Sequence, residues 1–247
     1  MVLLRVAAAV AVLAIGAFVA MPCVFDNVIM APTHGDFVTY RLFNDIAYYC
    51  GFTDLATSPN FTVDIVSLEL SSQLFIHLSS AAWTAFLIGF PIIVYLLWGF
   101  ISPGLHAHER TAASKAFLAG NLMFYTGVAV GYFLVFPLAL RFLADYRLSE
   151  TIRPIVSLDS YIDNFFTLLV MMGAVFELPL VAWLLGRLGI LTRSFFTTYR
   201  RHAIVVLLII SAFITPTGDP FTLFLVFLPV YSLWEAAALL VPKDNSE

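Results

Sequence analysis

Residues 164–186 read NFFTLLVMMGAVFELPLVAWLLG and contain a single charged residue, Glu177, inside an apolar run. A helix needs about 20 apolar residues to cross the hydrocarbon core of a bilayer, so this stretch predicts a transmembrane helix. The whole chain of 247 residues has the same character, with 61% hydrophobic and 11% charged residues and a mean hydropathy of +0.95. Soluble domains are far more polar. The sequence therefore predicts an all-α membrane protein.

Further apolar runs complete the set of predicted spans. We expect six transmembrane helices, at about residues 2–22, 70–100, 113–142, 160–186, 203–216 and 221–241, with an outer loop at 23–69. The fifth run reaches only about 21 Å at 1.5 Å per residue, against a hydrocarbon core of about 30 Å, so a short fifth and sixth helix are expected. Only the polar stretch between Cys23 and Ser71 is long enough to bury a core of its own, and we expect one domain over residues 1–247.

The basic residues predict the orientation. If both termini are cytoplasmic, the cytoplasmic segments hold eight of the twelve basic residues: Arg5, Arg110, Lys115, Arg187, Arg193, Arg200, Arg201 and Lys243. The positive-inside rule then predicts a multi-pass protein of the cytoplasmic (inner) membrane. A cleaved signal peptide at Met1–Pro22 is the alternative, but the five remaining spans would leave the two ends on opposite sides.

Several classes of function are excluded by what the sequence lacks. The net charge is −4 without a basic cluster, which argues against a nucleic-acid partner. Cys23 and Cys50 lack the spacing of a zinc site, and His106 and His108 have no third ligand nearby, so no metal is expected. No nucleotide-binding glycine pattern occurs, and no other cofactor is expected. The two cysteines, both on the oxidising side, either pair or remain thiols.

The prolines indicate curved helices. Each removes a helix hydrogen bond and bends the axis, and four lie inside predicted spans: Pro91, Pro137, Pro179 and Pro229. A tight bundle would not need so many bends. We therefore expect a cupped scaffold with a concave face.

One cytoplasmic segment, WGFISPGLHAHER at residues 98–110, combines a helix end with a carboxylate. Pro103 and Gly104 end the second span, and Glu109 then opens the third helix. In one interpretation Glu109 is an anion that stabilises the helix amino terminus. In the other, a carboxylate on a rigid inner rim beside Phe100 is a bidentate partner for a guanidinium.

Two other groups of residues carry hypotheses. A carboxylate at the depth of Glu177, next to Pro179, costs about 2.5 to 3.5 kcal/mol to insert, so it faces protein, water or a partner. It either supports function or bonds to a neighbouring helix through Tyr125 or Thr126. The outer turn is either ordinary hairpin chemistry or a docking site, with residues Thr215, Pro216 and Asp219. Glu235, farther along the last helix, either belongs to this group or simply reaches the inner interface.

These motifs, in type and order, resemble the TatC family over about residues 70–242. The resemblance rests on residues 98–110, Phe124 with Tyr125 and Gly127, Phe136 with Pro137, residues 176–179, residues 199–201, the turn at residues 215–219 and residues 229–235. It implies the core subunit of the twin-arginine translocase, a glove-shaped protein with six helices and no enzymatic activity. The implied partners are TatA-like and TatB-like single-span proteins, the lipid bilayer and further copies of the chain.

By this likeness, the inner rim with Phe100, Pro103, Glu109 and Arg110 binds the twin-arginine signal peptides of folded cargo, and transport is driven by the proton-motive force. The family usually begins with an inner segment that carries a His-Leu-x-Glu-Leu-Arg pattern, whereas this chain begins almost at the first helix. The second carboxylate that the resemblance leads us to expect for the arginines is thus missing, and either the start is truncated or mis-set or recognition is weaker. The alternative function is a proton-coupled secondary transporter with Glu177 as the coupling group, but no inverted repeat of the spans is visible.

Overall fold

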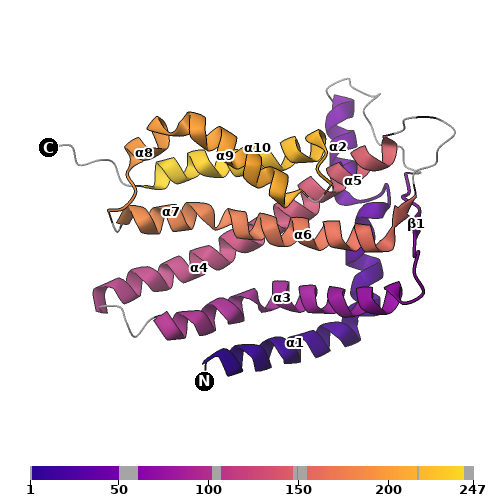
Figure 1. The fold of residues 1–247 in the computed structure, drawn as a ribbon, viewed down its shortest axis with the longest axis horizontal. Coiled ribbons are helices and arrows are strands. Elements are labelled where there is room, and N and C mark those ends of the chain that lie inside the picture. The colour runs from indigo at the N-terminus through magenta and orange to yellow at the C-terminus, as the bar shows by residue number, and fades with distance from the viewer. Residues whose placement is uncertain are drawn as a thin grey trace. The chain divides into compact units, whose positions relative to one another are not determined.

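The computed structural model describes residues 2–49, 61–101, 107–146, 149, 155–187, 189–215 and 217–241, and of residues 2, 3, 5, 6, 97–101 and 107–116 it describes the backbone alone. The described chain is almost entirely helical (Figure 1). Its elements are α1 (Val2–Val24), η1 (Phe25–Ile29), η2 (Ala31–Thr33), α2 (Val38–Tyr49), β1 (Ile65–Val66), α3 (Ser72–Ile101), α4 (Ala107–Val130), η5 (Gly131–Val135), α5 (Phe136–Asp145), β2 (Val156–Ser157), α6 (Leu158–Phe176), α7 (Leu178–Arg187), α8 (Arg193–Thr198), α9 (Arg200–Ile214) and α10 (Pro220–Leu240).

Five helical stretches of the described chain are long and apolar enough to cross a membrane: Ala7–Thr33, Ser72–Leu96, Phe117–Asp145, Leu158–Arg187 and Pro220–Leu240. The remaining predicted span is α9, whose 15 residues measure about 22 Å and do not cover the hydrocarbon core. Of the two helices expected to be short, α9 is short, whereas α10 has 21 residues and measures about 31 Å. The helix starts at Pro220, one residue before the predicted span, and continues through Pro229.

The chain forms two compact units. The first contains Leu3–Phe90 and Tyr132–Phe166, and the second contains Pro91–Gly131 and Thr167–Glu247. The single domain expected over residues 1–247 stays a prediction.

In the first unit, side chains from other helices bind carbonyl groups that prolines leave without a donor. Pro22 lies inside α1 and has no N–H for the carbonyl of Phe18, and His77 Nε2 of α3 lies 2.9 Å from that oxygen. The imidazole also stacks on the Phe18 ring, with centroids 4.1 Å apart. Likewise Pro137 leaves the carbonyl of Phe133 free, and the Thr39 hydroxyl of α2 donates to it. Because lipid offers no donors, these contacts let the bends persist in the membrane.

Tyrosine hydroxyls make similar contacts at the outer end of this unit. Tyr40 is fully buried, and its hydroxyl lies 2.9 Å from the carbonyl oxygen of Pro137 and 3.0 Å from that of Pro32. Burial, opposed in part by the charge of Arg141, raises the pKa of the Tyr40 phenol, so the group stays protonated and donates. Tyr161 donates to the carbonyl of Ile29 and Tyr132 to that of Val28. These bonds join α2 to η2 and α5, and η1 to η5 and α6.

The segment at residues 23–69, expected to be an outer loop, contains regular structure. It holds the end of α1, the π-helical turn η1, the 3₁₀ turn η2, the 12-residue helix α2 and β1. Strand β1 pairs in parallel with β2, with Ile65 opposite Val156. Helix α2 was not predicted, because only long apolar runs were considered; its amphipathic periodicity could have indicated it.

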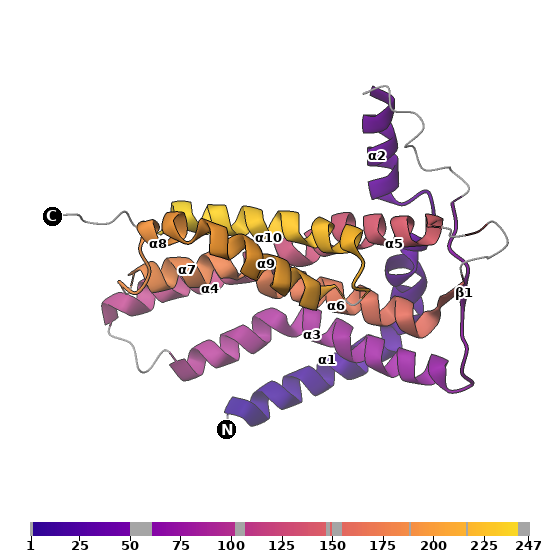
Figure 2. The same cartoon turned by 45° about the horizontal axis from the view of Figure 1, so that its top comes forward.

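In the second unit, glycines let α4 approach the second half of α6. A Cβ on Gly127 would lie 2.4 Å from the carbonyl oxygen of Met172 and 2.8 Å from Cβ of Phe176. A Cβ on Gly173 would lie 2.6 Å from the ring of Phe124. In the same unit α10 packs against α9 and α7 (Figure 2). Small residues at such contacts allow close van der Waals packing, which is a main source of helix association in lipid.

Candidate functional site

The inner rim expected to bind signal peptides lies where α3 ends and α4 begins. Phe100 belongs to the last turn of α3, while Glu109 and Arg110 belong to the first turn of α4, which starts at Ala107. Pro103 lies outside the described residues, and of Phe100, Glu109 and Arg110 the backbone alone is described. The backbone thus gives Glu109 the helix-terminal position predicted from the sequence, next to amide groups that have no partner within the helix.

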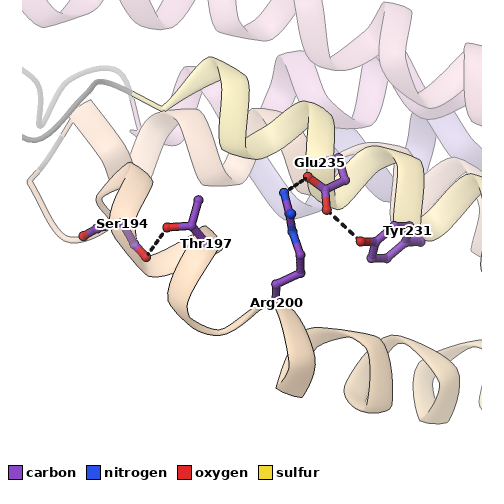
Figure 3. Close-up of polar contacts among 5 residues, drawn as sticks. All are labelled: Ser194, Thr197, Arg200, Tyr231 and Glu235. Atoms are coloured by element: carbon purple, nitrogen blue, oxygen red, sulfur yellow. Dashed lines mark hydrogen bonds and ion pairs between the residues drawn. The ribbon is translucent and has the colours of Figure 1, made fainter.

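A polar network joins α9 to α10. Arg200, the first residue of α9, places one guanidinium nitrogen 2.7 Å from Oε2 of Glu235, and the Tyr231 hydroxyl donates to Oε1 of the same carboxylate at 2.7 Å (Figure 3). In α8, the Thr197 hydroxyl donates to the carbonyl of Ser194. The side chains of Arg200 and Glu235 are 52% and 33% exposed, so water and salt screen the pair, and it contributes about 0.2 to 1 kcal/mol.

This network contradicts the grouping of Glu235 with the outer turn and favours the alternative, a position at the other end of the last helix. Glu235 lies near the opposite end of α10 from Asp219, about 24 Å along the helix at 1.5 Å per residue. It belongs with Arg200 at the end where α9 begins and α10 finishes. Arg200 and Tyr231 were not predicted as partners of Glu235. Tyr231 could have been predicted from the sequence, because it lies one turn before Glu235 on the same helix, whereas Arg200 lies on another helix.

Aromatic residues surround the same end of this unit. The ring centroid of Trp234 in α10 lies 4.7 Å from that of Phe196 in α8. Phe196 belongs to a buried cluster with Ala182 and Ala237, and the partly buried Trp234 packs against this cluster. The guanidinium of Arg187 lies 4.8 Å from the centre of the Trp183 ring. Basic and aromatic side chains of this kind anchor helix ends at a membrane surface.

Glu177 lies at the break between α6 and α7. Pro179 has no N–H to donate, and the helix resumes when Val181 donates to the carbonyl of Glu177 at 3.0 Å. The carboxylate points toward α4, because a Cβ added to Gly120 would lie 3.1 Å from Oε2 of Glu177. Its Oε1 is buried and accepts no hydrogen bond within the described part of the chain. The break therefore holds a half-buried carboxylate against the smallest residue of α4.

The structural alternative for Glu177 was a bond to a neighbouring helix through Tyr125 or Thr126. Thr126 does not make it, because its hydroxyl donates to the carbonyl of Leu122 in its own helix at 2.7 Å. A carboxylate oxygen without a donor is costly at membrane depth. A polar group outside the described contacts, from water or a partner, would lower that cost.

The outer turn is organised by Asp219. Its Oδ1 accepts from the backbone amide of Thr222 at 2.7 Å, which caps α10, and its Oδ2 accepts from the Thr217 hydroxyl at 2.6 Å. Burial alone would raise the pKa of Asp219, but these hydrogen bonds outweigh it and lower the pKa below its ordinary value. The Thr215 hydroxyl donates to the carbonyl of Ser211, and Pro216 lies outside the described residues. The described residues of the turn therefore form a helix cap in which the polar side chains bond to each other and to nearby backbone.

Asp219→Ala is expected to lower the free energy of unfolding by about 1 kcal/mol, because the cap of α10 is lost. Asp219→Asn keeps an acceptor oxygen and should lose less. Since the folded state lowers the pKa of Asp219, the stability it contributes is present above the pKa of the unfolded group, about 3.9, and is lost as the pH falls through the folded value. Thermal unfolding in detergent between about pH 3 and 7 measures this. Equal unfolding temperatures for the parent and the alanine variant across that range would contradict it.

Comparison with known proteins places these features in a family. The chain matches the profile described as "Sec-independent protein translocase protein (TatC)" over residues 1–229. A protein of that name from Deinococcus radiodurans is 37% identical over 178 residues, covering 72% of this chain and 66% of the relative. One from Campylobacter jejuni is 30% identical over 191 residues, covering 77% of this chain and 78% of the relative.

Two solved structures have the same fold. One, described as the crystal structure of the twin arginine translocase receptor TatC, is 28% identical, covers 96% of both chains and superposes with a TM-score of 0.62. The second, the same receptor in the detergent DDM, is 29% identical, covers 97% of this chain and 99% of the other, and has a TM-score of 0.65. The similarity extends over nearly the whole length of each structure.

Proposed function

The chain belongs to the TatC family of Sec-independent protein translocase proteins, and from that membership we propose that it binds the twin-arginine signal peptides of folded proteins and nucleates assembly of the export site. It is a multi-pass membrane protein and a subunit of the twin-arginine translocase. We place it in the cytoplasmic membrane with both termini inside, because eight of its twelve basic residues then lie in cytoplasmic segments. Family membership favours this function over a proton-coupled transporter.

The observation that carries the signal-peptide proposal is the position of Glu109 in the first turn of α4, beside the end of α3. A carboxylate there accepts two parallel hydrogen bonds from one guanidinium, a geometry that an ammonium cannot reproduce. Phe100 and Arg110 belong to the same rim, with Pro103 between the two helices. We propose that this rim receives the arginine pair, with Glu109 as the principal charged contact.

We propose that TatA-like and TatB-like single-span proteins bind near α9 and α10 in a multi-copy assembly. The short α9 leaves an apolar face uncovered, with Val205 57%, Ile209 52% and Phe213 83% exposed. A helix of 15 residues is too short for the hydrocarbon core, so a neighbouring apolar helix would relieve the mismatch. The outer turn with Thr215, Pro216 and Asp219 would lie beside such a partner.

We propose that Glu177, with Pro179 maintaining the break beside it, supports transport rather than folding. The carboxylate is half-buried, its Oε1 has no donor among the described residues, and Gly120 leaves space next to it. Export driven by the proton-motive force requires no nucleotide or other cofactor. We expect no enzymatic activity from this chain.

Glu177→Gln tests this function. The amide has nearly the same size and keeps hydrogen-bonding capacity while it removes the charge, so we expect membrane levels near those of the parent and a clear loss of export. The measurement is export of a folded twin-arginine substrate in a strain that lacks its own TatC. Glu69→Gln, at an exposed outer position, is the matched control and should leave export unchanged. Loss of the protein from the membrane would assign Glu177 to folding instead.

A further inference from the structure

Helix α2 has three distinct faces. At about 100° per residue, Val38, Leu42, Ile46 and Tyr49 fall within an arc of about 80°. All four are exposed, at 62%, 60%, 53% and 89%. The adjoining arc is the buried face, which carries Thr39, Tyr40 and Ala47. The remaining arc is polar, with Arg41, Asn44 and Asp45. We call the four exposed apolar residues the α2 stripe.

The contacts of α2 with α5, all inside the first unit, give the depth at which the helix lies. Its first turn is bound to η5 by Thr39, which donates to the carbonyl of Phe133, and to α5 by Tyr40, whose hydroxyl lies 2.9 Å from the carbonyl oxygen of Pro137. Pro137 lies about two turns, or about 12 Å, before the end of α5 at Asp145. That carbonyl is inside the candidate span Phe117–Asp145. Helix α2 thus begins below the outer end of a membrane-spanning stretch.

Farther along, α2 meets the charged end of α5. The guanidinium of Arg141 lies 5.6 Å from the centre of the Phe43 ring and forms an ion pair with Asp145 at 3.7 Å. Arg141 lies one turn beyond Pro137 in α5. We take the charged end of α5 as the region where the span passes from hydrocarbon to headgroups. Helix α2 runs across the direction of α5 in both views of the fold (Figures 1 and 2). Its length therefore lies along the membrane surface.

We propose that α2 is an interfacial helix whose stripe of Val38, Leu42, Ile46 and Tyr49 is inserted into the outer leaflet of the bilayer. An apolar arc beside a polar arc, at the depth of the headgroup boundary, is the pattern of a helix that lies in the membrane surface. The polar arc stays in water, where Arg41 and Asp36 form an exposed ion pair at 3.6 Å. Tyr49, at the end of the stripe, belongs to the aromatic belt of that surface, whereas Tyr48 lies on the polar arc.

Lipid fits this surface better than a second copy of the chain. Four side chains cannot bury the roughly 1,200 to 2,000 Å² of a stable protein interface. Other apolar side chains of the same unit are exposed on a candidate membrane span, since α1 exposes Val12, Ile15 and Val19 along its length. An isolated apolar arc that begins inside a spanning stretch needs no protein partner to be covered.

The test is the environment of single labels on α2. In a background with Cys23→Ser and Cys50→Ser, bimane is attached at Ile46→Cys on the stripe, at Asp45→Cys on the polar arc, and at Val12→Cys in α1 as a lipid-facing reference. The protein is placed in nanodiscs with or without a lipid that carries a nitroxide near the headgroup. The lipid quencher should reduce the fluorescence at positions 46 and 12 at least about threefold more than at position 45, as burial in the headgroup and acyl boundary requires. Aqueous iodide should show the reverse order.

Two results would overturn the proposal. Equal quenching by iodide at positions 45 and 46, with position 12 protected, would mean that the stripe lies in water. Protection of position 46 from both quenchers, together with a disulfide-linked dimer of the Ile46→Cys protein, would mean that a second copy covers it. Position 12 reports correct insertion in every sample, so a misfolded variant is recognised by the loss of its lipid signal.

Discussion

Glu109→Ala is expected to weaken the binding of a twin-arginine signal peptide by about ten- to a hundredfold, while the protein still inserts into the membrane. A charge-assisted, partly desolvated pair between arginine and carboxylate contributes about 1.5 to 3 kcal/mol, which is the free energy of that change. Screening at the surface moves the result toward the low end of the range. Site-specific photocrosslinking of the peptide, titrated at one salt concentration, measures the effect.

Matched variants separate the charge of Glu109 from a general change in the rim. Glu109→Asp should be intermediate because its shorter side chain moves the carboxylate, and His108→Ala, in the same turn of α4, should bind as the parent does. A twin-lysine peptide should bind the parent less tightly than a twin-arginine peptide, and Glu109→Ala should shrink that difference. If the alanine variant binds the twin-arginine peptide as tightly as the parent, Glu109 is only a charge at the start of a helix.

Gly127→Ala is expected to reduce the amount of folded protein more than alanine at any other glycine of the described helices. The new Cβ would meet the carbonyl oxygen of Met172 at 2.4 Å, and backbone cannot rotate away as a side chain can. Moving α4 from α6 to relieve the clash would also open the contact at Gly173 with Phe124. Overpacking of this kind costs about 1 to 3 kcal/mol or more. The measurement is the thermal unfolding temperature in detergent, with membrane levels alongside.

Two other glycines are the controls for this prediction. Gly16→Ala adds the same methyl group to α1, where no atom lies within 4 Å, and should leave stability unchanged or slightly improved. Gly120→Ala meets the Leu180 side chain at 3.0 Å and the carboxylate of Glu177 at 3.1 Å, so it should have an intermediate effect. Unfolding temperatures for Gly127→Ala and Gly16→Ala that agree would contradict the close contact between α4 and α6.

The spans were predictable from the sequence because insertion depends on the summed hydropathy of about 20 neighbouring residues. The same local physics predicted a bend at Pro179, the helix start before Glu109 and the turn at Asp219, since each depends on residues a few positions apart. The family resemblance was also visible in the order of short motifs, and the comparisons confirm it. Hydropathy did not predict α2, because a half-polar helix has a low average hydropathy whatever its periodicity.

The contacts between helices could not be predicted in this way, because they depend on which surfaces fold against each other. His77 binds the carbonyl that Pro22 leaves free, yet the two residues are far apart in sequence. Arg200 pairs with Glu235 rather than leaving that carboxylate to the outer turn. Hydropathy is a sum over single residues and is read along the chain, whereas each of these bonds is a property of a pair. Its partners are selected by the three-dimensional packing that brings distant helices within a few ångströms.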